Sequence, residues 1–172
     1  NLALRKPVTC SSTENAAFPC ANAVDGSTTT RWSSAFSDPQ WIYVDLGATY
    51  SINRVVLNWE AAYGRSYQIQ VGSSTSSWTT IYSTTTGNGA TDDLAVSGSG
   101  RYVRMNGTVR ATGYGYSLWE FQVFAGGTPP PTTPPPTTPP PTTPPPTTPP
   151  PTTPPPTTPP PAPSPRRPGG CS

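Results

Sequence analysis

Residues 40–46, Q-W-I-Y-V-D-L, alternate in polarity and are rich in aromatic and β-branched side chains. This pattern is typical of a strand with one face on a core and the other on solvent. Similar runs, separated by Gly, Ser, Asn and Thr clusters that favour turns, are residues 52–59, 67–71, 78–82, 101–105 and 118–124. No segment keeps a helical period over three turns. The sequence therefore predicts an all-β domain, an antiparallel sandwich or barrel.

The composition divides the chain into one domain and a tail. Residues 1–126 are of mixed composition, whereas residues 127–168 are dominated by Pro and Thr in a repeated P-P-P-T-T unit. Because proline fixes φ and lacks an amide donor, we expect a disordered, extended polyproline-type linker that spans on the order of 100 Å. A proline-rich ligand for another protein is the rival interpretation, but the regular period favours a stalk, with or without sugar on its threonines. Residues 169–172 would begin a further module.

The charge balance argues against a nucleic-acid partner. Arg166 and Arg167 lie in the tail, and without them eight Lys and Arg face eight Asp and Glu. The domain's arginines are scattered among acids, whereas phosphate binding needs clustered cations. The sequence also lacks an apolar run near the ~20 residues that span a bilayer, so we expect no membrane partner. A monomer is expected.

The cysteines indicate an oxidising compartment. Cys10 and Cys20 flank a polar loop, and a disulfide between them would contribute about 2–3 kcal/mol. Two free buried cysteines are the alternative. A disulfide predicts a secreted, extracellular protein, and Cys171 would pair outside this sequence. The chain opens at Asn1 without a leader, so either a signal peptide has been removed or the chain is an excised fragment.

The residue types present argue against catalysis. Histidine is absent, which removes the commonest general base, the Ser–His and Cys–His pairs, and ordinary zinc sites. Glu14 with Glu60, or Asp92 with Asp93, could be nominated as a glycosidase pair. However, adjacent residues of a strand point to opposite faces, and a small sandwich with short loops seldom forms a deep cleft. We expect no catalytic residue in this chain.

Several motifs, in order along the domain, together resemble the discoidin, or factor 5/8 type C, family. They are N-L-A-L-R-K-P-V-T at 1–9, A-V-D-G-S-T-T-T-R-W at 23–32, W-I-Y-V-D-L-G at 41–47, the run 52–59, G-R-Y-V-R-M at 100–105 and L-W-E-F-Q-V-F at 118–124. The resemblance implies an eight-stranded jelly-roll-like β-sandwich whose two ends meet.

Within that superfamily, the loops are similar to those of bacterial family 32 carbohydrate-binding modules. The similar features are Glu14, T-R-W, S-A-F, N-W-E-A-A-Y and A-T-G-Y-G-Y-S-L-W-E. The resemblance implies a non-catalytic module that targets a polysaccharide-degrading enzyme. Lipid- or cell-surface-adhesion discoidin domains are the alternative, although lipid binders carry apolar loop spikes that this sequence lacks. The tail P-G-G-C-S resembles the start of a family 2 cellulose-binding module, which implies a tethered second binding module or a catalytic domain.

A calcium site is predicted in the loop that follows residue 24. Asp25 precedes Gly26, and hydroxyl and carbonyl oxygens follow within a few residues, as a hard cation with six to eight oxygen ligands requires. The predicted ligands, of which the resemblance supplies the first and last, are Ala23 (carbonyl), Asp25, Ser27, Thr30 and Glu120. Ser27 stands where many relatives carry Asn or Asp, so it would contribute only its backbone oxygen. The calcium would be structural; the alternative makes Asp25 a turn former and Glu120 an ion-pair partner.

Sugar binding needs an aromatic plate for a pyranose face and planar hydrogen-bonding groups for its hydroxyls. The resemblance assigns these roles to Glu14, Arg31, Phe36, Glu60, Tyr63 and Tyr114 or Tyr116. Two carboxylates favour a cationic polymer such as chitosan; with a neutral glucan they would accept hydroxyl protons. Each could also be an ordinary solvated charge. The sequence therefore predicts a polysaccharide or oligosaccharide partner.

The tryptophans of the strands are divided between core and ligand platform. An indole within a strand is more often buried than exposed, so Trp41 and Trp119 are assigned to the core. Trp32 and Trp59 stay undecided between the two roles.

Overall fold

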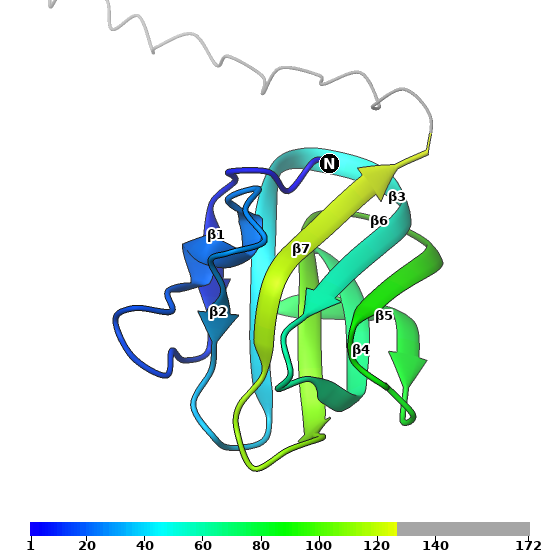
Figure 1. Cartoon of the computed structure of the whole chain (residues 1–172). Coiled ribbons are helices and arrows are strands. Elements are labelled where there is room, and N and C mark those ends of the chain that lie inside the picture. Colours follow the sequence, from blue (N-terminus) through cyan, green and yellow to red (C-terminus); the bar gives the residue numbers. More distant parts are fainter. Residues whose placement is uncertain (127–172) are drawn as a thin grey trace, which may run out of the picture. The chain divides into compact units, whose positions relative to one another are not determined.

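The computed structural model describes residues 1–126. The predicted linker and the start of a further module lie outside the described residues and stay predictions. The elements (Figure 1) are β1 (Val8–Cys10), the 3-10 helix η1 (Cys20–Val24), β2 (Trp32–Ser33), β3 (Gln40–Trp59), β4 (Gly64–Ser74), β5 (Ser77–Thr84), β6 (Thr91–Arg110) and β7 (Ser117–Ala125). Within residues 1–126, no helix is long and apolar enough to cross a membrane.

Two long strands, β3 and β6, organise the sheet. They pair antiparallel along most of their length, with a register shift between the pairs of Asp45 and Tyr50. The first half of β3 pairs with β1, and the second half of β6 continues to β4 and β5. The second half of β3 pairs with β7, which pairs with β2.

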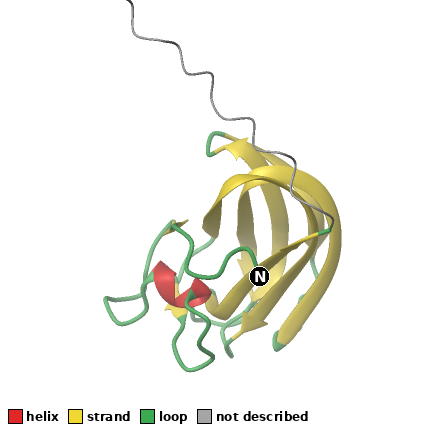
Figure 2. Ribbon diagram, turned by 90° about the horizontal axis from the view of Figure 1, so that it is seen from above, coloured by secondary structure: helices red, strands yellow, loops and turns green. Residues whose placement is uncertain are grey.

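The register shift lets each long strand belong to two layers. Gly47, with φ +85°, lies in the shifted segment of β3, and a bulge bends the strand and increases its twist. The sheet therefore curls back on itself, as the view from above shows (Figure 2). This confirms the predicted antiparallel β-sandwich. The described residues form seven strands rather than the eight expected, and the two predicted runs 40–46 and 52–59 are both parts of β3.

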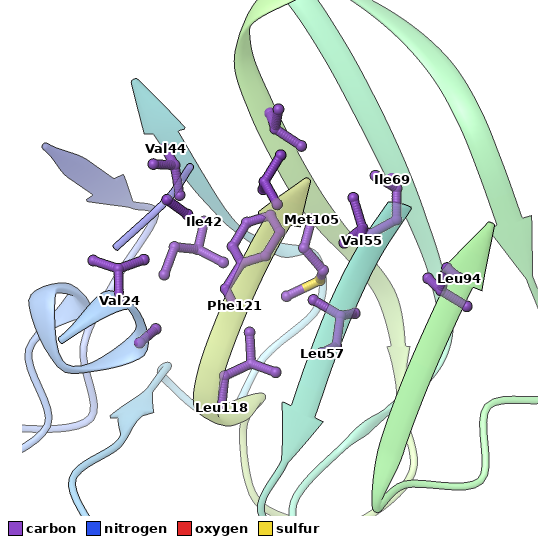
Figure 3. Packing of buried hydrophobic residues seen from close by; sticks show 14 of the residues in the cluster. Val24, Ile42, Val44, Val55, Leu57, Ile69, Leu94, Met105, Leu118 and Phe121 are labelled. Carbon is purple, nitrogen blue, oxygen red and sulfur yellow. The ribbon is translucent and has the colours of Figure 1, made fainter. Parts of the chain in front are cut away.

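The alternation of residues 40–46 decides what enters the core. Ile42, Val44 and Leu46 are buried, whereas Trp41, Tyr43 and Asp45 between them are only half-buried. Figure 3 shows Ile42 and Val44 facing the same apolar cluster as Phe121, Met105 and Leu57 from β7, β6 and the far half of β3. Burying such a side chain contributes about 1.5–3 kcal/mol.

The assignment of Trp41 and Trp119 to the core is wrong. Both are half-buried at outward-facing strand positions, whereas Trp32 and Trp59 are 0% and 4% exposed and belong to the core. Side chains of a strand alternate between its two faces, so the position of a residue in the strand decides its burial more than its own hydrophobicity does. Trp41 precedes inward-facing Ile42, so its own side chain has to point outward.

The short β1 and β2 and the first part of β6 were not predicted. β1 and β2 have three and two residues, too few for alternation to be detected. The expected meeting of the ends is confirmed, because Leu2 donates its amide to the Val123 carbonyl at 2.7 Å and the Asn1 side chain accepts the Val123 amide.

The predicted disulfide joins Cys10 at the end of β1 to Cys20 at the start of η1. It closes a loop that carries Glu14. Between β1 and η1, residues 11–19 form no helix or strand that would hold the loop in place. The cross-link therefore limits how far Glu14 can move from the sandwich.

Replacing both cysteines, Cys10→Ser with Cys20→Ser, is expected to lower the free energy of unfolding by about 2–3 kcal/mol, because the unfolded chain regains loop entropy. Urea denaturation of the oxidised parent and the double variant measures this difference. The reduced parent is the control and should match the variant. An unchanged denaturation midpoint would contradict the structural role of the cross-link.

Candidate carbohydrate-binding site

An open pocket of about 300 Å³ lies among the loops at the lower end of the sandwich in Figure 1. Its walls come from the loops after β1, β3 and β6 and from β2 with the residue before it. The residues are Glu14, Arg31, Ser33, Glu60, Ala61, Ala62, Thr112 and Tyr114. A second hollow of about 240 Å³ shares Glu14 and is lined also by Ala35 and Phe36. Four segments distant in sequence thus converge on Glu14.

Arg31 is a fixed hydrogen-bond donor in the pocket wall. Its Nη1 donates to Ser117 Oγ at 2.8 Å and lies 3.9 Å from Glu14 Oε2. Its guanidinium also lies 3.8 Å from the centroid of the Phe18 ring. Because Phe18 and Ser117 position the group on two sides, Arg31 loses little conformational freedom when it binds a ligand.

The two carboxylates of the pocket are held differently. Glu14 is fixed through its backbone, since its amide donates to the Ser33 carbonyl at 2.7 Å. Glu60 is fixed through its side chain as well, because its Oε2 accepts the Ala62 amide at 3.0 Å. Each carboxylate keeps acceptor sites for a ligand, because an ionised carboxylate accepts about four hydrogen bonds.

Phe36 and Tyr114 form an aromatic rim beside the pocket. Their ring centroids are 5.6 Å apart and their planes perpendicular. They are 47% and 65% exposed, and only Leu4 and Val109 are comparably exposed among the large apolar residues of the described chain. Exposed aromatic rings at the edge of a polar pocket provide the platform on which a pyranose ring stacks.

Asp38 fastens the loop of Phe36 to the loop of Tyr114. It accepts hydrogen bonds from the Tyr116 hydroxyl and from Arg110 Nε, the latter at 3.2 Å. Arg110 Nη1 in turn donates to the carbonyls of Gly113 and Tyr114. The aromatic rim is therefore positioned by a partly exposed polar cluster of Asp38 and Arg110.

Tyr116 does not reach the pocket. Its side chain is 0% exposed, and burial together with the Asp38 hydrogen bond raises the pKa of its hydroxyl far above the usual range. Of the two tyrosines predicted as alternatives, only Tyr114 lies at the surface. Tyr116 is fixed by two backbone hydrogen bonds to Ser34: its amide donates to Ser34 Oγ at 2.8 Å and its carbonyl accepts the Ser34 amide at 2.9 Å. The close approach of the two segments leaves no room for a side chain at Gly115.

Tyr63 is half-buried and lies outside the pocket lining, with its ring packed against Gly89. Of the predicted sugar-binding residues, the pocket lining contains Glu14, Arg31, Glu60 and Tyr114. Phe36 lies at the rim, and Tyr63 and Tyr116 lie outside the pocket. Sequence reasoning missed Thr112 and the supporting Asp38. Thr112 lies in the A-T-G-Y segment, residues 111–114, which resembles the family loops. No neighbouring residue marks the role of Asp38, because its partners are more than seventy positions away in the sequence.

The other carboxylate pair considered, Asp92 and Asp93, is not a site. Asp92 accepts hydrogen bonds from Trp59 Nε1 at 2.8 Å and the Tyr67 hydroxyl at 2.6 Å. Asp93 forms a bidentate ion pair with the exposed Arg54. The two carboxylates have separate partners on β6, as expected for adjacent strand residues.

The predicted calcium loop places two carboxylates close together. Glu120 is buried, its Oε1 accepts the Gly26 amide at 2.8 Å, and its Oε2 has no hydrogen-bond partner. Burial is the largest cause that raises the pKa of Glu120, and the neighbouring Asp25 adds to it. A buried acceptor without a donor is costly, and a cation would satisfy it.

Asp25 shapes the same loop. Its Oδ1 accepts the Ser27 amide at 2.8 Å and its Oδ2 accepts the Thr30 hydroxyl at 2.6 Å. Asp25 is therefore a turn former, as the alternative held, whereas Glu120 takes part in none of the ion pairs among residues 1–126. Those residues contain no cluster of three or more His, Cys, Asp or Glu, so a cation here would rely on hydroxyl and carbonyl oxygens besides the two carboxylates.

Comparisons with known proteins agree with the fold of residues 1–126. The model of the F5/8 type C, NedA-like, galactose-binding domain matches residues 22–105. The crystal structure of chitosan-binding module 1 from a chitosanase/glucanase of Paenibacillus sp. IK-5 is 56% identical, with a TM-score of 0.70, over 73% of this chain and 98% of that one. The chain belongs to the F5/8 type C family.

Two further proteins resemble this F5/8 type C domain. Chitosan-binding module 2 of the same Paenibacillus enzyme, solved in complex with chitotriose, is 53% identical, with a TM-score of 0.70, over 73% of this chain and 100% of that one. The polysaccharide lyase 8 family protein HylA of Enterococcus faecalis is 39% identical over 72 residues. That match spans 42% of this chain and 5% of HylA.

Asp38→Ala is expected to destabilise the domain by about 1–3 kcal/mol, because the buried Tyr116 hydroxyl loses its acceptor. It should also weaken the nuclear Overhauser contacts between the Phe36 and Tyr114 rings. Urea denaturation and NMR spectroscopy measure the two effects. Asp93→Ala, which breaks an exposed ion pair, is the control and should change neither quantity appreciably. Ring contacts that persist unchanged in Asp38→Ala would contradict the positioning role of Asp38.

Proposed function

We propose that this domain is a non-catalytic carbohydrate-binding module whose loop-end pocket binds an amino-sugar polymer of the chitosan type. The observation that carries the proposal is the arrangement of Glu14 and Glu60 in one open pocket beside the Phe36–Tyr114 rim. The 53–56% identity to two chitosan-binding modules, one of them solved in complex with chitotriose, supports the same ligand class.

The charge of the pocket favours a cationic sugar. Two carboxylates and one guanidinium line it, so the wall carries a net negative charge near the bound ring. An ammonium group on the sugar can pair with a carboxylate through a charge-assisted hydrogen bond. Arg31, held by Ser117 and Phe18, would then donate to a sugar hydroxyl rather than to the amine.

The openness of the pocket fits binding rather than hydrolysis. Glycoside hydrolysis requires two carboxylates that flank the scissile bond, with water controlled around them. Glu14 and Glu60 instead line a hollow at the surface, and Glu60 Oε2 is already engaged by the Ala62 amide. These carboxylates therefore act as hydrogen-bond acceptors and charge partners.

The placement of the pocket suits a targeting role. β7 ends at Ala125, at the end of the sandwich opposite the loops that form the pocket (Figure 1). The described domain therefore ends on the side away from the pocket. We propose that the whole protein is a secreted polysaccharide-degrading enzyme, for which the disulfide provides support, because disulfides persist in oxidising compartments.

Glu14→Gln and Glu60→Gln are each expected to weaken chitotriose binding about 5- to 10-fold, which corresponds to about 1–1.4 kcal/mol. The substitution keeps the shape and removes the charge that pairs with an ammonium group. Isothermal titration calorimetry measures the affinities at low and high salt. The affinity of the parent should fall with salt, because the pocket is exposed and its charges are screened.

Asp93→Asn is the matched control, since it neutralises an exposed carboxylate on β6, outside the pocket lining. It should bind chitotriose like the parent. Equal affinities for the parent, Glu14→Gln and Glu60→Gln would contradict the proposed pairing. Stronger binding to a neutral glucan oligosaccharide than to chitotriose would assign the carboxylates to hydroxyl groups instead.

We also propose that the loop after η1 binds one structural calcium ion. The ligands would be the carboxylates of Asp25 and Glu120, the Thr30 hydroxyl, and the backbone oxygens of Ala23 and Ser27. The buried, unpartnered Glu120 Oε2 supports this proposal. When bound, the ion would compensate the charge of two neighbouring carboxylates and link the first loop to β7.

Adding calcium at about 100 times its Kd is expected to stabilise the domain by about 2.7 kcal/mol, which raises Tm by roughly 5–10 °C. Calorimetry in calcium and in EDTA measures this shift. Glu120→Gln should lose most of the calcium-dependent shift, and Asp93→Asn should keep it. A parent Tm that is equal in calcium and EDTA would contradict the site.

A further inference from the structure

The outer face of the layer formed by β5, β4, β6 and the first half of β3 carries a cluster of aromatic rings. Tyr43 lies at its centre, with ring-centroid distances of 5.6 Å to Trp41, 5.7 Å to Trp78 and 6.0 Å to Tyr102. The outward face of an antiparallel sheet is normally polar. Here three strands place four half-buried aromatic side chains on it.

Planar hydrogen-bonding groups are fixed among these rings. Arg104 lies with its guanidinium carbon 4.2 Å from the Trp78 ring centroid, and its Nε donates to Gln70 Oε1 at 2.7 Å. The Gln70 amide donates in turn to Gln68 and to Thr80. Tyr43, Arg104, Gln70 and Thr80 form one cross-strand row. We call Trp41, Tyr43, Trp78, Tyr102, Gln70 and Arg104 the outer aromatic face.

This surface is separate from the loop-end site. None of its residues lines either hollow beside Glu14, and both hollows are formed by loops, whereas the outer aromatic face is built on strands. A ligand for this surface is therefore one that lies flat on a sheet. An extended polymer chain meets that requirement, and a short oligosaccharide held in a pocket does not.

The charges of the face differ from those of the pocket. Asp45 is neutralised by a bidentate pair with Arg101, with Nε and Nη2 at 2.7 and 2.8 Å. Among the described residues no carboxylate lies within ion-pair distance of Arg104. The remaining charge is positive, so this face disfavours a polymer of ammonium groups.

We infer that the outer aromatic face binds an extended, uncharged, β-linked glucan chain. The rings offer π faces to the C–H groups of successive pyranoses. Arg104, whose Nε is held by the buried Gln70, offers its remaining guanidinium N–H groups to their hydroxyls. Because stacking and hydrogen bonds hold these side chains before binding, little side-chain entropy is lost. The inference rests on this surface alone and does not depend on the ligand of the loop-end pocket.

The full 172-residue chain is tested by depletion from solution onto insoluble β-1,3-glucan and cellulose. Tyr43→Ala and Trp78→Ala should each lower the partition coefficient on the retained polymer about 5- to 10-fold. Trp78→Phe, which keeps a ring, should retain most of the binding. Thermal unfolding by circular dichroism checks that each variant is folded.

Phe124→Ala is the matched control. Phe124 lies on β7, away from the outer aromatic face, and is also half-buried. Its ring centroid lies 4.9 Å from the Arg54 guanidinium carbon. The variant should be retained like the parent. Glu14→Gln should also keep its retention on glucan, while Tyr43→Ala and Trp78→Ala keep their affinity for chitotriose. This crossed pattern separates a failure of the outer face from a failure of the loop-end pocket.

Three results would overturn the inference. The first is a failure of the binding test itself: either neither glucan retains the parent, or a folded Trp78→Ala variant is retained as well as the parent. The second is retention confined to an acidic polysaccharide and abolished by salt, which would assign Arg104 to a carboxylate ligand. The third is concentration-dependent self-association that Trp78→Ala removes without any effect on glucan, which would assign the face to a second copy of the chain.

Discussion

The antiparallel pairing of β3 with β6 supports both layers of the sandwich. Each strand has 20 residues, and the register shift between Asp45 and Tyr50 divides the pair into two halves that belong to different layers. The inward side chains of both halves meet in one core. Because the strands that flank β3 and β6 add to one half or the other, the ladder also determines which loops gather at each end.

The pocket depends on that arrangement through its supporting residues. The hydroxyl of Ser117, at the start of β7, accepts a hydrogen bond from Arg31, and its carbonyl accepts one from the Glu60 amide. Asp38, just before β3, holds Arg110, at the end of β6, and Tyr116. Strand ends thus position Arg31, Glu60 and the loops of the aromatic rim. The loops can therefore present charge and aromatic rings on short segments without a large loss of order on binding.

The charges on the two surfaces are arranged in opposite ways. At the loop end, two carboxylates outnumber one guanidinium, and an exposed aromatic pair lies at the rim. On the outer aromatic face, Arg104 lies among aromatic rings, and Asp45 is already paired with Arg101. Both surfaces combine rings with planar polar groups, which suits saccharides, and their opposite charges underlie the different polymers proposed for them.

The sequence by itself determined the longer strand segments, the antiparallel sandwich, the disulfide and half of the residues that line the pocket. Strand alternation and family motifs are local, so they are readable without coordinates. Only the tertiary structure decided that Trp41 faces outward while Trp32 and Trp59 are buried, that Tyr114 rather than Tyr116 reaches the surface, and that Asp38 supports the rim. These outcomes depend on register and on contacts between residues tens of positions apart. A single sequence does not encode such contacts in any local pattern, because they form only when the sheet closes on itself.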